Sequence, residues 1–228
     1  MRAGSSKLLG RVRIEVASSP IAKPPADVKF EDQTLVAGTT LYRICIDNRG
    51  ATEFADCDGP TRRFGPWRRA SGECVAVLYT ASTLDAVIME VAFHDVVLTL
   101  PEPKAFLSDL RMRRSTLTLR RDLRLARLDD PALAQLGISR AELIDTPPSK
   151  YHETALWAGA VHDDPSGFDG LVWNSQRHPS SLVQVLFADR VDRLADIDVA
   201  AEPVPMLSGN GYEELMAVAT AHGITVIH

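Results

Sequence analysis

Residues with acid–base and anion-binding chemistry stand next to apolar segments in this 228-residue sequence. Glu90 and His94 are four residues apart in a stretch with helical apolar spacing, so a helix would place both on one face. Ser175 and Arg177 follow the apolar run 170–174. A carboxylate can stabilise positive charge in a transition state, and a guanidinium binds phosphates and carboxylates through its rigid fork. The arginines therefore favour a phosphate-bearing ligand or an acidic partner.

Further polar candidates stand in the first half of the chain. Arg43 follows an aromatic residue in a short apolar run, and Tyr79 lies in the apolar run 74–80. The stretch 47–72 is rich in Gly, Pro, Asp and Arg, and a loop this long is usually functional. Its Phe-Gly-Pro-Trp segment is surrounded by Arg62, Arg63 and Arg68. Taken singly, each residue has an ordinary explanation, such as a surface ion pair or a core aromatic.

The sequence lacks the motifs of several common enzyme classes. It has no Gly-x-Ser-x-Gly elbow, no Walker phosphate loop, no Gly-x-Gly-x-x-Gly fingerprint and no His-Glu-x-x-His zinc motif. His152 and Glu153, with His162, are the only histidine–carboxylate group that suggests a metal. Helical groups of this kind are more often surface or interface polar residues, so no metal is expected.

Apolar periodicity predicts a mixed α+β fold with short strands. Strands are expected over 35–46, 74–80, 170–174, 182–187 and 224–227, with two more inside 111–127, where leucines alternate with arginines. Helices are expected over 83–94, 130–164 and 210–222, the second one broken at Pro147-Pro148. Ser82 and Asp85 have capping-box spacing, so a strand should lead directly into the helix that carries Glu90.

Composition is that of an ordinary globular protein, with 45% hydrophobic and 24% charged residues. Disorder, collagen-like repeats and coiled coil are poor explanations for such a chain. The formal net charge of −5 argues against a protein that binds nucleic acid directly. Twenty of the 25 basic residues are arginine. This ratio fits a ligand with phosphates, and a genome-wide codon bias explains it equally well.

Cysteine usage and hydropathy predict the compartment. Cys45, Cys57 and Cys74 cannot all pair within one chain and show no Cys-x-x-Cys spacing, which favours a reducing cytoplasm. No apolar run approaches the roughly 18 residues that span a membrane, and Leu8-Leu9 is too short for a signal-peptide core. The sequence therefore predicts a cytoplasmic protein without a membrane partner.

Several segments, in order, resemble the RES-domain family, which is named for a characteristic Arg, Glu and Ser. They are Leu41-Tyr-Arg-Ile, Arg62-Arg-Phe-Gly-Pro-Trp, Val77-Leu-Tyr-Thr-Ala-Ser-Thr, Ala86-Val-Ile-Met-Glu, Gly170-Leu-Val-Trp-Asn-Ser-Gln-Arg and Leu186-Phe-Ala-Asp-Arg. The resemblance covers residues 35–195, and on its pattern Arg43, Glu90 and Ser175 are the three name-giving residues. We expect a domain over 34–228, preceded by an N-terminal extension over 1–33.

The resemblance implies an ADP-ribosyltransferase-like fold, a bent central β-sheet of short strands surrounded by helices. It also implies the toxin of a type II toxin–antitoxin system, which breaks the nicotinamide–ribose bond of NAD and is blocked by a cognate antitoxin protein. Breaking that bond builds positive charge on the ribose, which Glu90 would stabilise.

The other candidates receive roles in NAD binding from the same resemblance. Arg43 and Arg63, with Arg177, would hold the diphosphate through their forked donors. Tyr79 would stack on the nicotinamide cation. Ser175 would hydrogen-bond a ribose hydroxyl or the carboxamide. His94 would orient Glu90 or hold the acceptor.

The acceptor of ADP-ribose stays open at this point. The length beyond the compact family members favours a protein acceptor, for example an enzyme of nucleotide synthesis. The alternative is an NAD phosphorylase or glycohydrolase, whose acceptor is phosphate or water. A different hypothesis is that the protein is not an enzyme and docks an acidic partner through 111–127. That stretch also fits a strand face exposed to solvent. A DNA-binding regulator fits poorly, because the chain is acidic and shows no clear helix-turn-helix.

Overall fold

The computed structural model describes residues 19–107 and 111–227 of the chain. The strands in these residues are β1 (Asp32–Leu35), β2 (Thr40–Ile46), β3 (Trp67–Arg68), β4 (Cys74–Val75), β5 (Val77–Ala81), β6 (Lys104–Phe106), β7 (Met112–Leu119), β8 (Leu123–Arg127), β9 (Gly170–Asn174), β10 (Leu182–Phe187), β11 (Ile197–Val199), β12 (Val204–Pro205) and β13 (Thr225–Ile227). The helices are α1 (Leu84–Val91), α2 (Asp130–Gln135), α3 (Arg140–Leu143), α4 (Tyr151–Asp163) and α5 (Gly209–Ala221), with a 3-10 turn over Pro148–Lys150.

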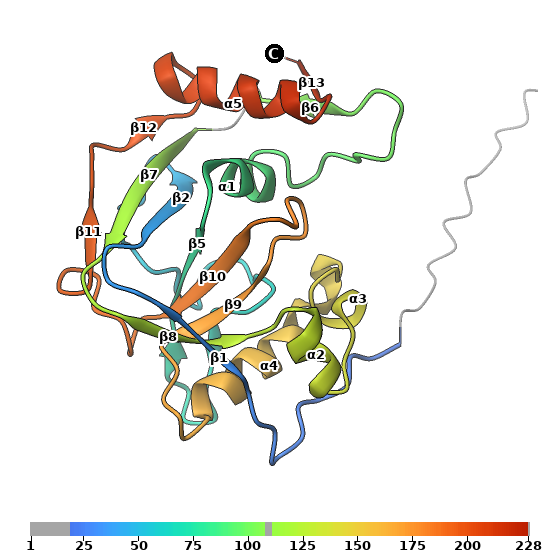
Figure 1. Cartoon of the computed structure of the whole chain (residues 1–228), viewed down its shortest axis with the longest axis vertical. Coiled ribbons are helices and arrows are strands. Elements are labelled where there is room, and N and C mark those ends of the chain that lie inside the picture. The colour runs from blue at the N-terminus through green and yellow to red at the C-terminus, as the bar shows by residue number, and fades with distance from the viewer. Residues whose placement is uncertain (1–18, 108–110, 228) are drawn as a thin grey trace, which may run out of the picture.

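A nine-stranded sheet forms the centre of the fold, in the order β1-β8-β9-β10-β5-β2-β7-β11, with β12 also paired to β7. Neighbouring strands run antiparallel except β8 and β9, which are parallel. The sheet is strongly bent, and the helices lie around it (Figure 1). The short pairs β3–β4 and β6–β13 are separate from it. The predicted α+β class, with a central sheet of short strands, is confirmed.

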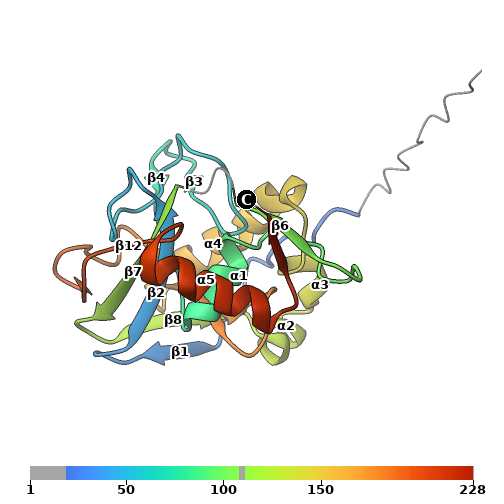
Figure 2. The same cartoon turned by 90° about the horizontal axis from the view of Figure 1, so that it is seen from above.

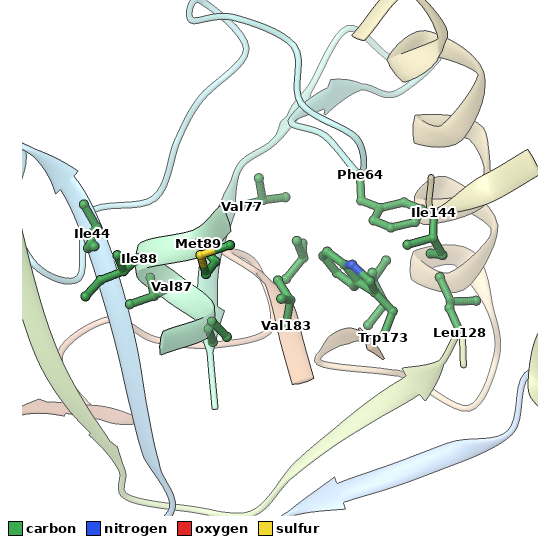
Figure 3. Close-up of a cluster of buried hydrophobic side chains, with 14 of the residues drawn as sticks. Ile44, Phe64, Val77, Val87, Ile88, Met89, Leu128, Ile144, Trp173 and Val183 are labelled. Atoms are coloured by element: carbon green, nitrogen blue, oxygen red, sulfur yellow. The ribbon is translucent and has the colours of Figure 1, made fainter. Parts of the chain in front are cut away.

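Alternation along the strands divides the buried side chains between the two faces of the sheet. One face forms a core with the helices, which we call the helix-side core. At one end of it Phe64 and Trp173 lie near Ile144, at the other end are Ile88 and Met89 of α1, and Val183 lies between the two groups (Figure 3). The other face forms a leucine core, made largely of Leu35, Leu41, Leu78, Leu117, Leu119, Leu123, Leu125 and Leu186. The leucines that alternate with arginines between 111 and 127 are thus buried, as their period predicts.

Helix α1 follows β5 directly, as predicted, and carries Glu90 in its last turn. Its N-cap is Thr83, one residue later than the capping-box spacing predicts, and Thr83 Oγ1 accepts the Ala86 N–H at 3.2 Å. The helix ends three residues earlier than predicted, because Phe93 turns into the core with its N–H on the Ile88 carbonyl. Helix α1 lies against β2, β5 and α5, and α5 crosses over it (Figure 2). Glu90 is therefore carried by an element held on several sides.

The described part of the predicted extension contacts the domain. Ile21, Val28 and Phe30 pack against the helix-side core, and the indole N–H of Trp157 in α4 donates to the Ala22 carbonyl at 2.8 Å. The remainder of that extension, residues 1–18, lies outside the described residues.

Five of the seven arginines between 111 and 127 form ion pairs with carboxylates of this same chain. The most buried is Arg114, which makes two hydrogen bonds of 2.8 Å to Glu214 of α5. The others are Arg120–Asp198, Arg121–Asp169, Arg124–Asp32 and Arg127–Glu31. The hydrogen bond to Asp198 raises the pKa of Arg120. Much of this stretch is neutralised internally, which argues against its docking an acidic partner.

Cys57 and Cys74 form a disulfide, with Cα atoms 5.9 Å apart. It closes the loop that contains β3 and the turn to β4. Disulfides are uncommon in the reducing cytoplasm that the number and spacing of the cysteines favour. That number and spacing do not show that the chain brings Cys57 and Cys74 together. Cys45 is free and partly buried, and burial raises the pKa of its thiol.

Two negative findings apply to residues 19–107 and 111–227. None of the helices there is long and apolar enough to cross a membrane. No group of three or more His, Cys, Asp or Glu side chains in these segments is placed to hold a metal ion.

Candidate active site

Glu90 and Ser175 meet where the last turn of α1 reaches the loop after β9. The Ser175 hydroxyl donates to Glu90 Oε1 at 2.5 Å. The same oxygen accepts the backbone N–H groups of Gln176 at 2.8 Å and of Arg177 at 3.3 Å. One loop thus supplies three donors to one carboxylate oxygen, which fixes its orientation. Among the described residues, no hydrogen bond reaches Glu90 Oε2.

Ser175 is fully buried and its hydroxyl is saturated with hydrogen bonds. Besides donating to Glu90, Oγ accepts the backbone N–H groups of Arg177 at 3.1 Å and of His178 at 2.8 Å. A serine hydroxyl offers one donor and two acceptor lone pairs, so all of its capacity is used. The predicted contact of Ser175 with a ribose hydroxyl or a carboxamide does not fit this geometry, which points instead to a residue that positions Glu90.

The same loop is also tied to the start of α1. His178 Nδ1 and Ser181 Oγ are 2.9 Å apart, and Ser181 Oγ lies 2.8 Å from Oγ1 of Thr83, the N-cap residue. The loop therefore contacts both ends of the helix that carries Glu90. A change in the loop would move the carboxylate.

A tight turn places two arginines over aromatic rings. The Arg62 guanidinium carbon is 5.9 Å from the centroid of the Tyr79 ring, and that of Arg63 is 5.5 Å from the Tyr151 ring. Arg63 is 6% exposed, and its Nη2 donates to Gln176 Oε1 at 2.8 Å. Through Gln176, Arg63 is joined to the loop that holds Glu90.

Tyr79 stands beside this turn, on the helix-side face of β5. Its hydroxyl accepts the backbone N–H of Phe64 at 3.0 Å, and its ring contacts Trp173 edge-on. Burial raises the pKa of Tyr79 to about 12, so its hydroxyl stays protonated at neutral pH. Tyr79 and Arg63, for which the resemblance implies separate roles in NAD binding, lie close together here, because the Phe64 N–H that bonds the Tyr79 hydroxyl is next to Arg63 in the chain.

Arg43 lies on the leucine-core face of β2, since Tyr42 and Ile44 on either side of it contact the helix-side core. It is 7% exposed, and among the described residues its hydrogen bond goes to the Ala51 carbonyl, at 2.9 Å. Desolvation lowers its pKa to about 10, and the neighbouring charge of Arg62 acts in the same direction. No carboxylate in the described chain forms an ion pair with Arg43. A buried guanidinium in this state would be stabilised by an anion.

Among the described residues, neither His94 nor the Arg177 side chain makes a hydrogen bond to Glu90. The helix ends before His94, so the two residues do not share a helical face as predicted, and His94 Nδ1 pairs with Asp95 at 2.8 Å. The Arg177 guanidinium donates to the Val96 carbonyl at 2.9 Å. Arg177 contributes its backbone N–H to the site rather than its charge.

Comparison with protein-family models finds the RES domain over residues 40–207. The chain belongs to the RES-domain family. The matched region begins with β2 and ends after β12, so it contains Arg43, Glu90 and Ser175. The structure joins Glu90 to Ser175, whereas among the described residues no hydrogen bond or ion pair joins Arg43 to either of them. Nothing matches the chain among curated proteins or among solved structures. RES domains are associated with toxin–antitoxin systems and with NAD.

Three residues of this RES site were not predicted from the sequence. Gln176 bonds both Glu90 and Arg63, Tyr151 underlies Arg63, and the Thr154 hydroxyl donates to the Arg63 carbonyl. The position of Gln176 between Ser175 and Arg177 is the only signal that the sequence offers. Tyr151 and Thr154 begin a helix distant in sequence from the arginine turn, and nothing in their spacing marks them.

A surface cavity of about 820 Å³ in the described part of the RES domain lies between the β3–β4 hairpin and α4. Trp67, Leu156 and Arg68 are among its lining residues, but none of the residues predicted to bind or cleave NAD is. The candidate site itself is closely packed, since Ser175 is fully buried and Arg43 and Arg63 nearly so.

Proposed function

We propose that this RES domain breaks the nicotinamide–ribose bond of NAD. The observation that carries the proposal is the fixed carboxylate of Glu90, with three hydrogen bonds on Oε1 and none from described residues on Oε2. Departure of nicotinamide leaves an oxocarbenium-like ribose. A carboxylate already oriented by the protein stabilises that charge without reorganising during the reaction.

The arginines support a dinucleotide substrate. Arg43 and Arg63 are both nearly fully buried, and no carboxylate in the described chain forms an ion pair with either. Arg63 lies beside the loop that holds Glu90, whereas Arg43 lies on the leucine-core face of β2. The Nε of Arg63 is buried without a hydrogen-bond partner in the described chain. Burying cations in this way is costly unless an anion binds them, and a diphosphate offers oxygens in the geometry that guanidinium forks match. Nicotinamide would stack on the Tyr79 ring, over which the Arg62 guanidinium lies in this structure.

The biological role that follows is a toxin held in check by a cognate antitoxin protein and acting on the NAD of the cytoplasm. Transfer of ADP-ribose to a protein is the acceptor reaction favoured by the length of the chain. One observation favours phosphate instead: His94 pairs with Asp95 and makes no hydrogen bond to Glu90 among the described residues, so it is not placed to act as a base beside Glu90. Phosphate is already an anionic nucleophile and needs no such base.

Purified protein incubated with NAD labelled on the adenylate phosphate, with and without cell lysate, tests the proposal. If phosphate or water is the acceptor, free nicotinamide must appear both with and without lysate. If a protein is the acceptor, one labelled protein band must appear when lysate is present. Absence of nicotinamide release under every condition contradicts the proposal.

A matched pair of arginine variants tests the role of Arg43. Arg43→Ala should weaken NAD binding at least tenfold, because removing a hydrogen bond to a charged group costs about 1.5–3 kcal/mol. Arg120→Ala, which alters an exposed ion pair with Asp198, should leave NAD binding unchanged. Equal losses in the two variants would remove Arg43 from the NAD site.

A further inference from the structure

Gln176 joins the two halves of the candidate site. Its backbone N–H donates to Glu90 Oε1 at 2.8 Å, and its side-chain Oε1 accepts from Arg63 Nη2 at 2.8 Å. A guanidinium has only donors, so Arg63 determines which way the amide faces. The oxygen points to Arg63, and the NH₂ group points away from it.

Arg63 is itself held in place, which makes this orientation stable. Its guanidinium lies over the Tyr151 ring, and its backbone carbonyl accepts the Thr154 hydroxyl at the start of α4. The side chain is nearly fully buried. The Gln176 amide is therefore presented in one orientation by neighbours that have little freedom to move.

The two N–H donors of Gln176 Nε2 have no hydrogen-bond partner among the described residues, and the side chain is partly exposed. They belong to the same residue whose backbone holds Glu90. The nearby Ser175 hydroxyl cannot take a further partner, because Glu90 and two backbone N–H groups use it fully. Next to the carboxylate, the amide of Gln176 is the side-chain donor free to meet an uncharged oxygen.

We propose that Gln176 is a substrate-contact residue whose Nε2 donates to an uncharged oxygen of the nicotinamide riboside half of NAD. The partner is the carboxamide oxygen or the ribose 2′-hydroxyl, which are both neutral acceptors. This inference rests on the proposed NAD cleavage. It assigns to Gln176 the contact that the family pattern would place on Ser175, and leaves Ser175 to position Glu90.

The test compares Gln176→Met with Gln176→Glu. Methionine removes both amide groups at similar length, whereas glutamate keeps an oxygen for Arg63 and presents no N–H donor. The substrates are NAD, an NAD analogue with hydrogen in place of the carboxamide, and one that lacks the 2′-hydroxyl on the nicotinamide ribose. Both Kd and kcat/KM are measured for each, and Gln135→Met, at an exposed position, serves as the matched control.

Gln176→Glu should lose about five- to tenfold in kcat/KM on NAD, the size of one neutral hydrogen bond. Gln176→Met should lose at least as much, because it also gives up the bond from Arg63. On the analogue without the partner oxygen the loss in Gln176→Glu should vanish, which identifies that oxygen. Equal losses on all three substrates, or full activity of Gln176→Glu on NAD, overturn the inference and leave Gln176 as a support for Arg63. NAD binding without cleavage by the wild-type protein overturns the proposed function alone, since the Kd values still test the contact. Absence of NAD binding overturns both.

Discussion

Replacing Ser175 by alanine tests whether Ser175 positions the Glu90 carboxylate or binds NAD. The change removes the 2.5 Å hydrogen bond to Glu90 Oε1, which involves a charged group and contributes about 1.5–3 kcal/mol. It also removes the acceptor of the His178 N–H, and an unsatisfied donor costs about 1–3 kcal/mol. The Arg177 N–H keeps its bond to Glu90 at 3.3 Å. Because these contributions are not additive, we expect a loss of about 3 kcal/mol in the free energy of unfolding.

The kinetic consequence follows from what stays in place. Gln176 and Arg177 still hold Glu90 Oε1, so the carboxylate remains in the site but is less firmly oriented. We expect kcat for nicotinamide release to fall about ten- to hundredfold, which is about 1.4–2.7 kcal/mol of transition-state stabilisation, while KM for NAD changes less than twofold.

Steady-state kinetics with chromatographic detection of nicotinamide, together with thermal unfolding, measure both effects. Ser180→Ala, an exposed serine in the same loop, is the control and should match the wild type in both. A KM raised tenfold with kcat unchanged would refute the reasoning, because it would show that Ser175 contacts NAD rather than Glu90.

Three more predictions come from other parts of the structure. Replacing Cys57 and Cys74 by serine removes a cross-link between positions 17 residues apart, which should lower the free energy of unfolding by about 3 kcal/mol. Thermal unfolding should show a Tm lower by roughly 6–12 °C, with Cys45→Ser as the control. An unchanged Tm would mean that the disulfide does not form. Desolvation lowers the pKa of Arg43 to about 10, so this group keeps its charge from pH 7 to 9 and loses it above pH 10. The Kd for NAD, measured by calorimetry, should therefore be constant from pH 7 to 9 and rise above pH 10. The Arg43→Ala variant should not show this rise. Above about pH 10 the same group binds more protons in the unfolded state than in the folded state, so its contribution to the free energy of unfolding increases with pH there. Gly170→Ala should lower the free energy of unfolding by more than about 3 kcal/mol in a denaturant titration, because the new Cβ would lie 2.0 Å from the Val185 carbonyl oxygen. Gly50→Ala, where a Cβ meets only ordinary contacts, is the control. Similar losses at both positions would contradict the close approach of β9 to β10.

Local sequence signals account for most of the strands and helices. Alternation of leucine and arginine identifies β7 and β8, and Leu117 and Leu125 are fully buried as that period requires. The strands β6, β11 and β12 have only two or three residues each, which is too short to show a period, and they exist because neighbouring strands pair with them. The early end of α1 depends on the burial of Phe93, which is a tertiary effect.

The candidate site was predictable as a set of residues but not as an arrangement. The family pattern identifies Glu90 and Ser175, and the structure brings them together across 85 residues of sequence. It does not indicate that the hydroxyl is used up on Glu90, because that depends on the conformation of the loop after β9. Helical spacing places His94 beside Glu90, and this fails once the helix stops at Val91. Gln176 carries no signal of its own, since its importance comes from its contact with the distant Arg63.

The central claim is that the Glu90 carboxylate is needed to break the nicotinamide–ribose bond. It is tested most directly by measuring how fast the Glu90→Gln variant releases nicotinamide from NAD. Glutamine keeps an oxygen that can accept from Ser175 and Gln176, so the fold should be preserved while the negative charge is lost. We expect the rate to fall at least about a hundredfold, the size of a lost electrostatic contact in a transition state, with Glu202→Gln at an exposed position as fast as the wild type. A Glu90→Gln variant that is folded and releases nicotinamide within twofold of the wild-type rate would contradict the claim.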